Sequence, residues 1–116
     1  MPADQFAIDV AIDRTTATIA ANGELDIFTA RDVAIRLHDA VALGCSRIVI
    51  DVSGVSFVDA SALGVLARAH AVLVSEGRTM EFVATGPRFV RLCSISRLDG
   101  VFGVPRWTPG GGTSAS

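Results

Sequence analysis

The 116-residue sequence contains little of what would indicate a membrane, secreted or nucleic-acid-binding protein. No apolar run reaches the roughly 20 residues that a membrane span needs. The first residues lack the basic start and apolar core of a secretory signal. Ten Lys and Arg against twelve Asp and Glu residues give a formal charge of −2, so no strong positive field attracts a phosphate backbone. We therefore expect a cytoplasmic protein that binds neither membrane nor nucleic acid.

Cysteine and histidine are also scarce, with two of each. Cys45 and Cys93 form no CxxC motif, which predicts ordinary buried thiols rather than a redox pair or a disulfide. His38 and His70 fall in the middle of predicted helices, and neither has a second His or Cys at metal-ligand spacing. We therefore expect no metal site, and we interpret both histidines as solvated or edge positions.

Motifs of nucleotide binding and of serine hydrolysis are absent. The sequence contains no GxGxxG or GxxxxGK[ST] phosphate loop and no GxSxG motif. A catalytic pairing of Ser61 with His70 fails on geometry, because nine residues of one helix would separate them by roughly 13 Å. We therefore expect no cofactor and no enzymatic activity.

What the sequence does contain is enough apolar residues, 50% of the total, for one packed core. In chain order, its periodicity predicts strands at 6–13 and 16–21, a helix at 29–43, a strand at 48–52, a helix at 60–75, a strand at 79–84, a helix from 87 onward and a weak strand at 101–104. This order predicts an α/β fold with a mixed, mostly parallel sheet opened by a β-hairpin and with helices packed against it. We expect one domain at 1–108 and a flexible Gly/Ser-rich tail at 109–116.

Local signals predict where these elements begin and end. The pair at 22–23, Asn-Gly, predicts a turn after the second strand. Thr29 and Asp59 are expected to cap the first and second helices. The unbroken apolar run at 48–50 predicts a strand that is covered on both faces, and we expect a loop between that strand and Asp59.

Residues 51–66 are the most informative segment, because there a buried strand leads to the N-terminus of the second predicted helix. With Asp59 as the cap, Ser61 lies in the first turn with its hydroxyl near solvent. Ser61, Gly64 and Arg68 recur at i, i+3 and i+7, so they share one low, smooth helix face. From the residues alone two interpretations are open: an ordinary capped helix, or a flat surface on which another protein docks.

The same segment resembles the signature of STAS domains, a fold shared by sulfate-transporter tails and bacterial anti-sigma factor antagonists. The residues that match this signature are Asp51, Val55, Phe57, Asp59, Ser61, Leu63, Gly64 and Leu66. A second motif of the family is matched by Gly23-Glu24-Leu25-Asp26 and Thr29-Ala30. Residues 98–102 resemble the family's closing segment more loosely, so the resemblance extends over about residues 6–104.

This resemblance implies an anti-sigma factor antagonist with a STAS-type fold. Such a protein binds a cognate anti-sigma factor, often an ATP-dependent serine kinase, and thereby releases a sigma factor. The kinase phosphorylates a serine at the start of the second helix and so ends the binding, and a phosphatase restores the active form. Any ATP and Mg²⁺ would belong to the kinase. The residues that we expect to contact the partner, here called the docking patch, are Asp26, Asp59, Ala60, Ser61, Gly64 and Arg68.

The sequence departs from the family pattern at the expected phosphorylation site. Ala60, which has no hydroxyl, occupies the place of the usual acceptor serine, and Ala62 replaces the usual glycine. Two hypotheses follow. Either Ser61 takes the phosphate, with the helix start slightly shifted, or this member is not switched and binds its partner constitutively. We favour Ser61, because it is the sole hydroxyl in the first turn.

The family also often adds a last helix after its closing strand. Pro105, Pro109 and the glycine run predict that this chain has no such helix. The surface that the helix would cover is then exposed or covered by Trp107, which we expect to pack locally.

Two other roles stay open. One is a STAS module that acts as a scaffold in a larger signalling assembly or as a transporter-associated subunit. The other is a small-molecule-binding domain, in which the sheet edge and the second helix hold a nucleotide or a lipid. Identifying the binding partner would test the first, and calorimetry with nucleotides and lipids would test the second.

Overall fold

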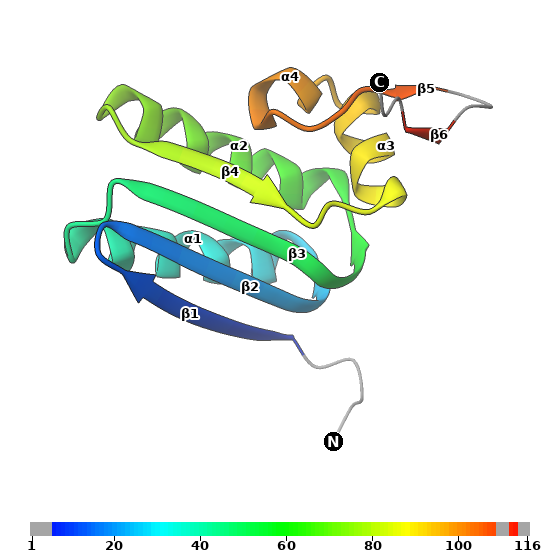
Figure 1. The fold of residues 1–116 in the computed structure, drawn as a ribbon. Coiled ribbons are helices and arrows are strands. Elements are labelled where there is room, and N and C mark those ends of the chain that lie inside the picture. Colours follow the sequence, from blue (N-terminus) through cyan, green and yellow to red (C-terminus); the bar gives the residue numbers. More distant parts are fainter. Residues whose placement is uncertain (1–5, 109–111, 114–116) are drawn as a thin grey trace.

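The structure of the protein is a computed structural model that describes residues 6–108 and 112–113 (Figure 1). Its main sheet has four strands in the spatial order β1 (Ala7–Asp13), β2 (Thr16–Leu25), β3 (Arg47–Val58) and β4 (Thr79–Val83). β1 and β2 form an antiparallel hairpin, and β2, β3 and β4 pair in parallel. The predicted α/β fold with a mixed sheet opened by a hairpin is confirmed.

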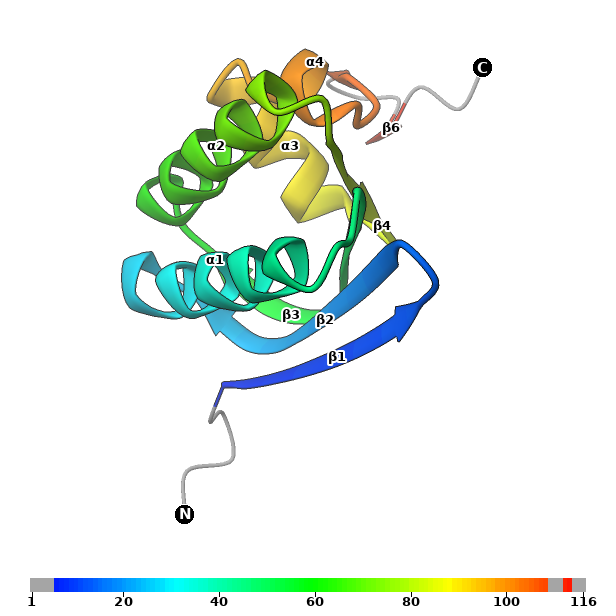
Figure 2. The ribbon, with the colours of Figure 1, turned by 90° about the vertical axis from the view of Figure 1, so that its left-hand side faces the viewer.

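The helices of the chain are α1 (Ile27–Ala42), α2 (Ala60–Ser75), α3 (Pro87–Ile95) and the short α4 (Asp99–Phe102). α1 and α2 lie side by side on one face of the sheet, and α3 and α4 lie near its β4 edge (Figures 1 and 2). The core forms between these layers, where Ile19, Ile48 and Ile50 of the sheet are buried together with Leu37 of α1 and Leu66 of α2.

The opposite face of the sheet carries no helix in the part of the chain that the structure describes (Figure 2). Residues 48–50 are all buried, as expected of a strand that is covered on both faces, but on this face the cover is not a helix. Val49 is nevertheless only 9% exposed. Its cross-strand neighbours Thr18 and Glu81 stand on the same face, so side chains of the sheet itself shield it.

β2 and β3 are both longer than the sequence predicts. The predicted turn at 22–23 is wrong, because β2 continues through Gly23, which has a φ of 109°, to Leu25. Irregular register on both sides of this pair accommodates the unusual backbone inside the strand. Because β2 extends, β3 keeps a parallel partner as far as Val58, and the loop expected before Asp59 does not exist.

The first helix begins two residues earlier than expected, at Ile27, and its N-cap is Asp26 rather than Thr29. The Oδ1 atom of Asp26 accepts hydrogen bonds from the backbone N–H groups of Phe28 and Thr29, each at 2.9 Å. In return, the Thr29 hydroxyl oxygen accepts from the Asp26 N–H at 2.8 Å. Thr29 is thus the second member of a capping box in which Asp26 is the first.

Residues 99–102 form α4, so the predicted strand at 101–104 is wrong. Phe102 turns into the core, where its ring lies 4.6 Å from that of Phe82 and 6.1 Å from that of His70. Gly103, with a φ of 68°, ends this turn of helix. No helix follows it as far as residue 108, the last residue described before the gap.

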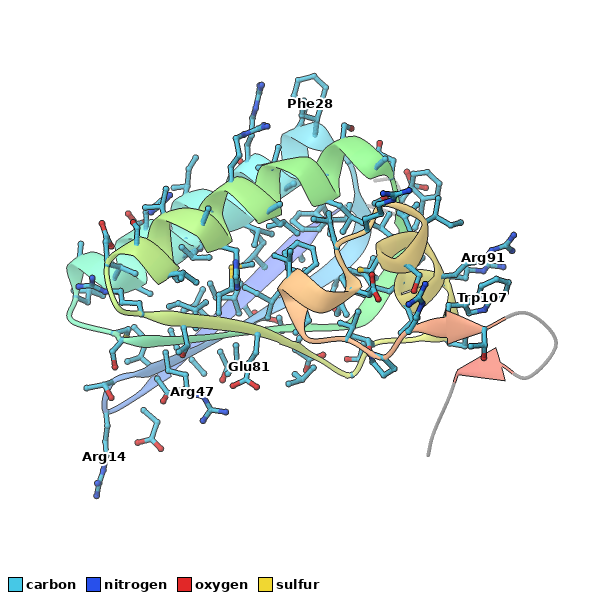
Figure 3. All side chains as sticks on the ribbon, turned by 90° about the horizontal axis from the view of Figure 1, so that it is seen from above. Arg14, Phe28, Arg47, Glu81, Arg91 and Trp107 are labelled. Atoms are coloured by element: carbon cyan, nitrogen blue, oxygen red, sulfur yellow. The ribbon has the colours of Figure 1, made fainter. Side chains whose placement is uncertain are left out.

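Trp107 packs locally, as expected. Its backbone N–H donates to the Ser94 hydroxyl of α3 at 2.8 Å, and the Arg91 guanidinium lies 4.9 Å from the centre of its ring (Figure 3). Two short segments, β5 (Trp107–Thr108) and β6 (Gly112–Thr113), pair in antiparallel fashion. The rest of the predicted tail at 109–116 lies outside the described residues, and the domain boundary at 108 stays a prediction.

Among the described residues, no helix combines the length and the hydropathy that crossing a membrane requires.

Candidate functional site

The carboxyl ends of β2 and β3 lie side by side, and each leads into a helix through one aspartate. Asp26 joins β2 to α1, and Asp59 joins β3 to α2. Leu25 pairs with Val58, and the N–H of Asp59 donates to the carbonyl oxygen of Leu25 at 3.2 Å. The parallel pairing therefore brings both helix N-termini and both capping carboxylates to one edge of the sheet.

At the start of α2 a single carboxylate oxygen holds two groups. Oδ1 of Asp59 accepts from the backbone N–H of Ala62 at 2.8 Å and from the hydroxyl of Ser61 at 2.8 Å. The predicted cap of the second helix is confirmed. α2 begins at Ala60, so Ser61 lies in the first turn without any shift of the helix start, and both residues are exposed.

At the start of α1 the carboxylate of Asp26 is held in its charged form. Its hydrogen bond with the backbone N–H of Thr29 lowers its pKa below the ordinary value of 3.8, and the Thr29 hydroxyl and the Phe28 N–H add to this effect. The carboxylate is therefore ionised at neutral pH. It gives this edge of the sheet a fixed negative charge beside Asp59.

The face of α2 that follows Ser61 is low and open. No atom lies within 4 Å of the position that a Cβ would take at Gly64, so nothing in the described chain covers the helix there. Arg68 is exposed one turn further on and forms no ion pair with a described residue. All six residues of the docking patch are thus found at the two helix starts or along α2, and none of them belongs to the buried core.

Two phenylalanines at this edge escaped the sequence analysis as candidate contact residues. Phe28, in the first turn of α1, is 69% exposed and points away from the body of the molecule (Figure 3). Phe57, two residues before Asp59, is 53% exposed. Large apolar side chains that solvent reaches beside a polar site are typical of protein interfaces. The signal available for Phe28 was an aromatic residue two positions after Asp26, the aspartate that the second family motif contains.

The cysteines and histidines do not form a reactive or metal-binding cluster among the described residues. Cys45 and Cys93 are buried free thiols, and burial, with a smaller effect of Asp99, raises the pKa of Cys93 to about 12. His38 is exposed and His70 is partly exposed. No group of three His, Cys, Asp or Glu residues suited to a metal ion occurs within 6–108 and 112–113.

Comparison with known proteins identifies the family. Residues 8–104 match the sequence model of a family described as "Mlab, STAS domain". The chain therefore belongs to the STAS domain family. It is similar to the crystal structure of an anti-sigma factor antagonist from Mycobacterium paratuberculosis, with 27% identity and a TM-score of 0.75 over 89% of this chain and 87% of that one.

Two structures of SpoIIAA share the fold. The anti-sigma factor antagonist SpoIIAA in its unphosphorylated form has 20% identity and a TM-score of 0.70, over 90% of each chain. The Bacillus cell fate determinant SpoIIAA in its phosphorylated form has 21% identity and a TM-score of 0.65, over 90% of this chain and 93% of that one. At this level of identity the likeness concerns the fold alone.

Proposed function

We propose that this protein is an anti-sigma factor antagonist, which binds a cognate anti-sigma factor through the docking patch and thereby releases a sigma factor. The proposal is supported by the likeness to the mycobacterial antagonist over most of both chains. The single observation that carries it is the exposed Ser61, hydrogen-bonded to the cap Asp59 at the start of α2, next to the second cap Asp26.

The docking patch has the properties that a protein partner needs. Gly64 lets a partner approach the backbone of α2 closely, since no side chain within 6–108 stands over it. Asp26, Asp59 and Arg68 provide charges of both signs, which orient a partner and select against wrong ones. Phe28, at 69% exposure, supplies an aromatic anchor next to the patch, at the start of α1.

We further propose that phosphorylation of Ser61 ends the binding. A phosphate adds a charge of about −1.5 to −2. It would also remove the proton that the Ser61 hydroxyl donates to Asp59, so that two anions face each other where one hydrogen bond exists now. Free N–H groups in the first turn of α2 can donate hydrogen bonds to the phosphate oxygens, so the fold survives. A constitutive binder without a switch remains the alternative hypothesis.

In this role the protein is not an enzyme and needs no cofactor. The anti-sigma factor is of the serine-kinase type and brings its own ATP and Mg²⁺, a phosphatase reverses the modification, and both act with this protein in the bacterial cytoplasm. The competing role is a STAS scaffold or transporter-associated subunit. Identifying the partner distinguishes these two roles, because only an antagonist is expected to capture a kinase that also binds a sigma factor.

Binding of the purified anti-sigma factor to variants of Ser61 tests the proposal. We expect Ser61→Ala to bind as the wild type does and Ser61→Glu to bind at least tenfold more weakly, with unchanged circular dichroism. Ala71→Glu is the matched control, because it adds the same charge at an exposed position of α2, about 15 Å along the axis from Ser61. Equal loss of affinity in both glutamate variants would contradict a switch at Ser61.

Phosphopeptide mapping tests the acceptor itself. The protein is incubated with the anti-sigma factor kinase, ATP and Mg²⁺, and the modified residue is identified by mass spectrometry. We expect phosphate on Ser61 and none in the Ser61→Ala variant. Phosphate on Ser53 or Ser56 would refute the assignment, whereas tight binding without any phosphorylation would establish the constitutive alternative.

A further inference from the structure

An open groove of about 960 Å³ lies between the carboxyl end of β3 and α3. Its origin is the unequal length of two neighbouring strands. β4 pairs with β3 only as far as Asp51, opposite Val83, whereas β3 continues to Val58. The chain leaves the sheet after β4 and returns as α3 at Pro87, so a space remains beside the part of β3 that pairs with β2 but not with β4.

The lining of this groove is mainly apolar. It includes Val55 and Phe57 of β3, and Phe89, Leu92 and Ile95 of α3. Phe57 is 53% exposed and Ile95 is 64% exposed, so two large apolar side chains face solvent along one concave surface. The volume falls within the range of about 300–1,000 Å³ that is usual for sites of small molecules, which are likewise mostly apolar.

The charged residues that line the groove are both cations, Arg88 and Arg91. They are three residues apart on α3 and therefore point from the same side of the helix. Neither forms an ion pair with a residue in the described part of the chain. The lining contains no Asp or Glu, so these two positive charges are not compensated within the groove.

Arg91 is held in place by Trp107. The Cζ atom of its guanidinium lies over the indole ring, 4.9 Å from the ring centre (Figure 3), and the backbone N–H of Trp107 donates to the Ser94 hydroxyl of the same helix. A cation–π contact does not use the N–H groups of a guanidinium as donors to an oxygen, so they remain available for hydrogen bonds to a carboxylate.

We propose that this groove binds a fatty-acid-type amphiphile, with the alkyl chain against β3 and α3 and the carboxylate at Arg88 and Arg91. Charge complementarity selects this occupant, since an apolar body satisfies the lining and one anionic end satisfies the two cations. The C-terminal segment 109–116 does not match these requirements, because it contains no large apolar and no acidic side chain. The proposal is independent of the anti-sigma factor and assigns the protein a second ligand.

Isothermal titration of the full chain with decanoate, below its micelle concentration, tests this proposal. We expect saturable binding of one decanoate per chain, and we expect acetate and the uncharged decanol to bind at least tenfold more weakly. The double variant Arg88→Gln, Arg91→Gln should bind decanoate at least tenfold more weakly than the wild type. Arg31→Gln, which removes an exposed arginine of α1 outside the groove, is the matched control and should leave the affinity unchanged.

A parallel titration with phosphatidylglycerol vesicles separates a free amphiphile from a membrane surface. Binding of free decanoate that depends on Arg88 and Arg91 supports the proposal. Binding of vesicles without binding of free decanoate overturns it, as does an equal loss in the Arg31→Gln control or equal affinity for decanol. Ser61→Glu should bind decanoate as the wild type does, so the outcome does not depend on the switch at the docking patch.

Discussion

Ser61 donates its hydroxyl proton to the same oxygen of Asp59 that caps α2, and both hydrogen bonds at that oxygen measure 2.8 Å. The proposed phosphate acceptor is thereby coupled directly to the start of the helix. A phosphate on Ser61 would compete with the Asp59 carboxylate for hydrogen bonds from the N–H groups of the first turn. The same contact places the proposed switch beside a carboxylate of the docking patch.

Replacing Asp59 measures how much this cap contributes to the free energy of unfolding. Asp59→Ala removes the acceptor for the Ala62 N–H, and we expect it to lower the free energy of unfolding by about 1 kcal/mol. Asp59→Asn keeps a capping oxygen and should remain close to the wild type. Urea unfolding followed by circular dichroism measures both. If Asp59→Ala were as stable as the wild type, the cap would contribute nothing.

The acid limb of the stability curve reports on Asp26. Its folded pKa lies below the ordinary value of 3.8, because the Thr29 N–H and the other capping donors favour the charged form. The stability gained from this shift is present above the unfolded pKa and is lost as the pH falls through the folded pKa. Asp26→Asn caps the helix without titrating. The difference in unfolding free energy between wild type and Asp26→Asn should therefore be constant near neutral pH and change in favour of the variant below about pH 4. A difference that does not vary with pH would contradict this.

Substitution by alanine should change the stability of the protein in opposite directions at Gly54 and at Gly64. A Cβ at Gly54 would lie 2.8 Å from Cγ of Asn22 and 3.3 Å from the backbone oxygen of Ala21, so we expect Gly54→Ala to destabilise the protein by about 1–3 kcal/mol. Gly64 lies in α2 with open space around it, and Gly64→Ala should stabilise the protein by about 0.5–1 kcal/mol. Thermal and urea unfolding measure both variants.

A second substitution tests the cause assigned to Gly54. Asn22→Ala removes the side chain that the new Cβ would strike. Asn22→Ala combined with Gly54→Ala should therefore cost less than the sum of the two single variants. Strict additivity would show that strain elsewhere in β3 explains the effect of Gly54→Ala.

The elements of the fold differ in how well the sequence alone predicts them. The bounds of α2 could be predicted, because its apolar stripe is long and Asp59 stands directly before it. Asn22 and Gly23 have the chemistry of a turn, yet pairing with β3 keeps them in a strand. Residues 99–102 are too few for any periodicity, and burial of Phe102 decides their conformation. In such places tertiary contacts override local preference.

Some features of the candidate site could be predicted from the sequence, and others depend on the fold. The roles of Ser61 and Asp59 could be predicted from their spacing at the start of a helix. Asp26 could be predicted as a contact residue only from the resemblance to STAS domains. That Asp26 and Asp59 share an edge follows from the parallel pairing of β2 with β3, which brings Leu25 opposite Val58. The groove depends on how far β3 extends beyond β4, a difference in length that no local pattern encodes.

Phe28 provides the sharpest test of where the proposed partner, an anti-sigma factor, docks. Its ring is 69% exposed, so Phe28→Ala should change the free energy of unfolding by no more than about 0.5 kcal/mol. If the interface extends from the docking patch over the start of α1, the Phe28 ring should become buried in the complex, and its removal should weaken binding about tenfold or more.

Val74→Ala is the matched control, since Val74 is 53% exposed near the far end of α2. It removes an exposed apolar side chain of the same protein without touching the docking patch. Surface plasmon resonance with immobilised anti-sigma factor compares the two variants. Equal affinities for Phe28→Ala and Val74→Ala would mean that the partner does not cover the start of α1, and the contact surface would then have to lie elsewhere on the domain.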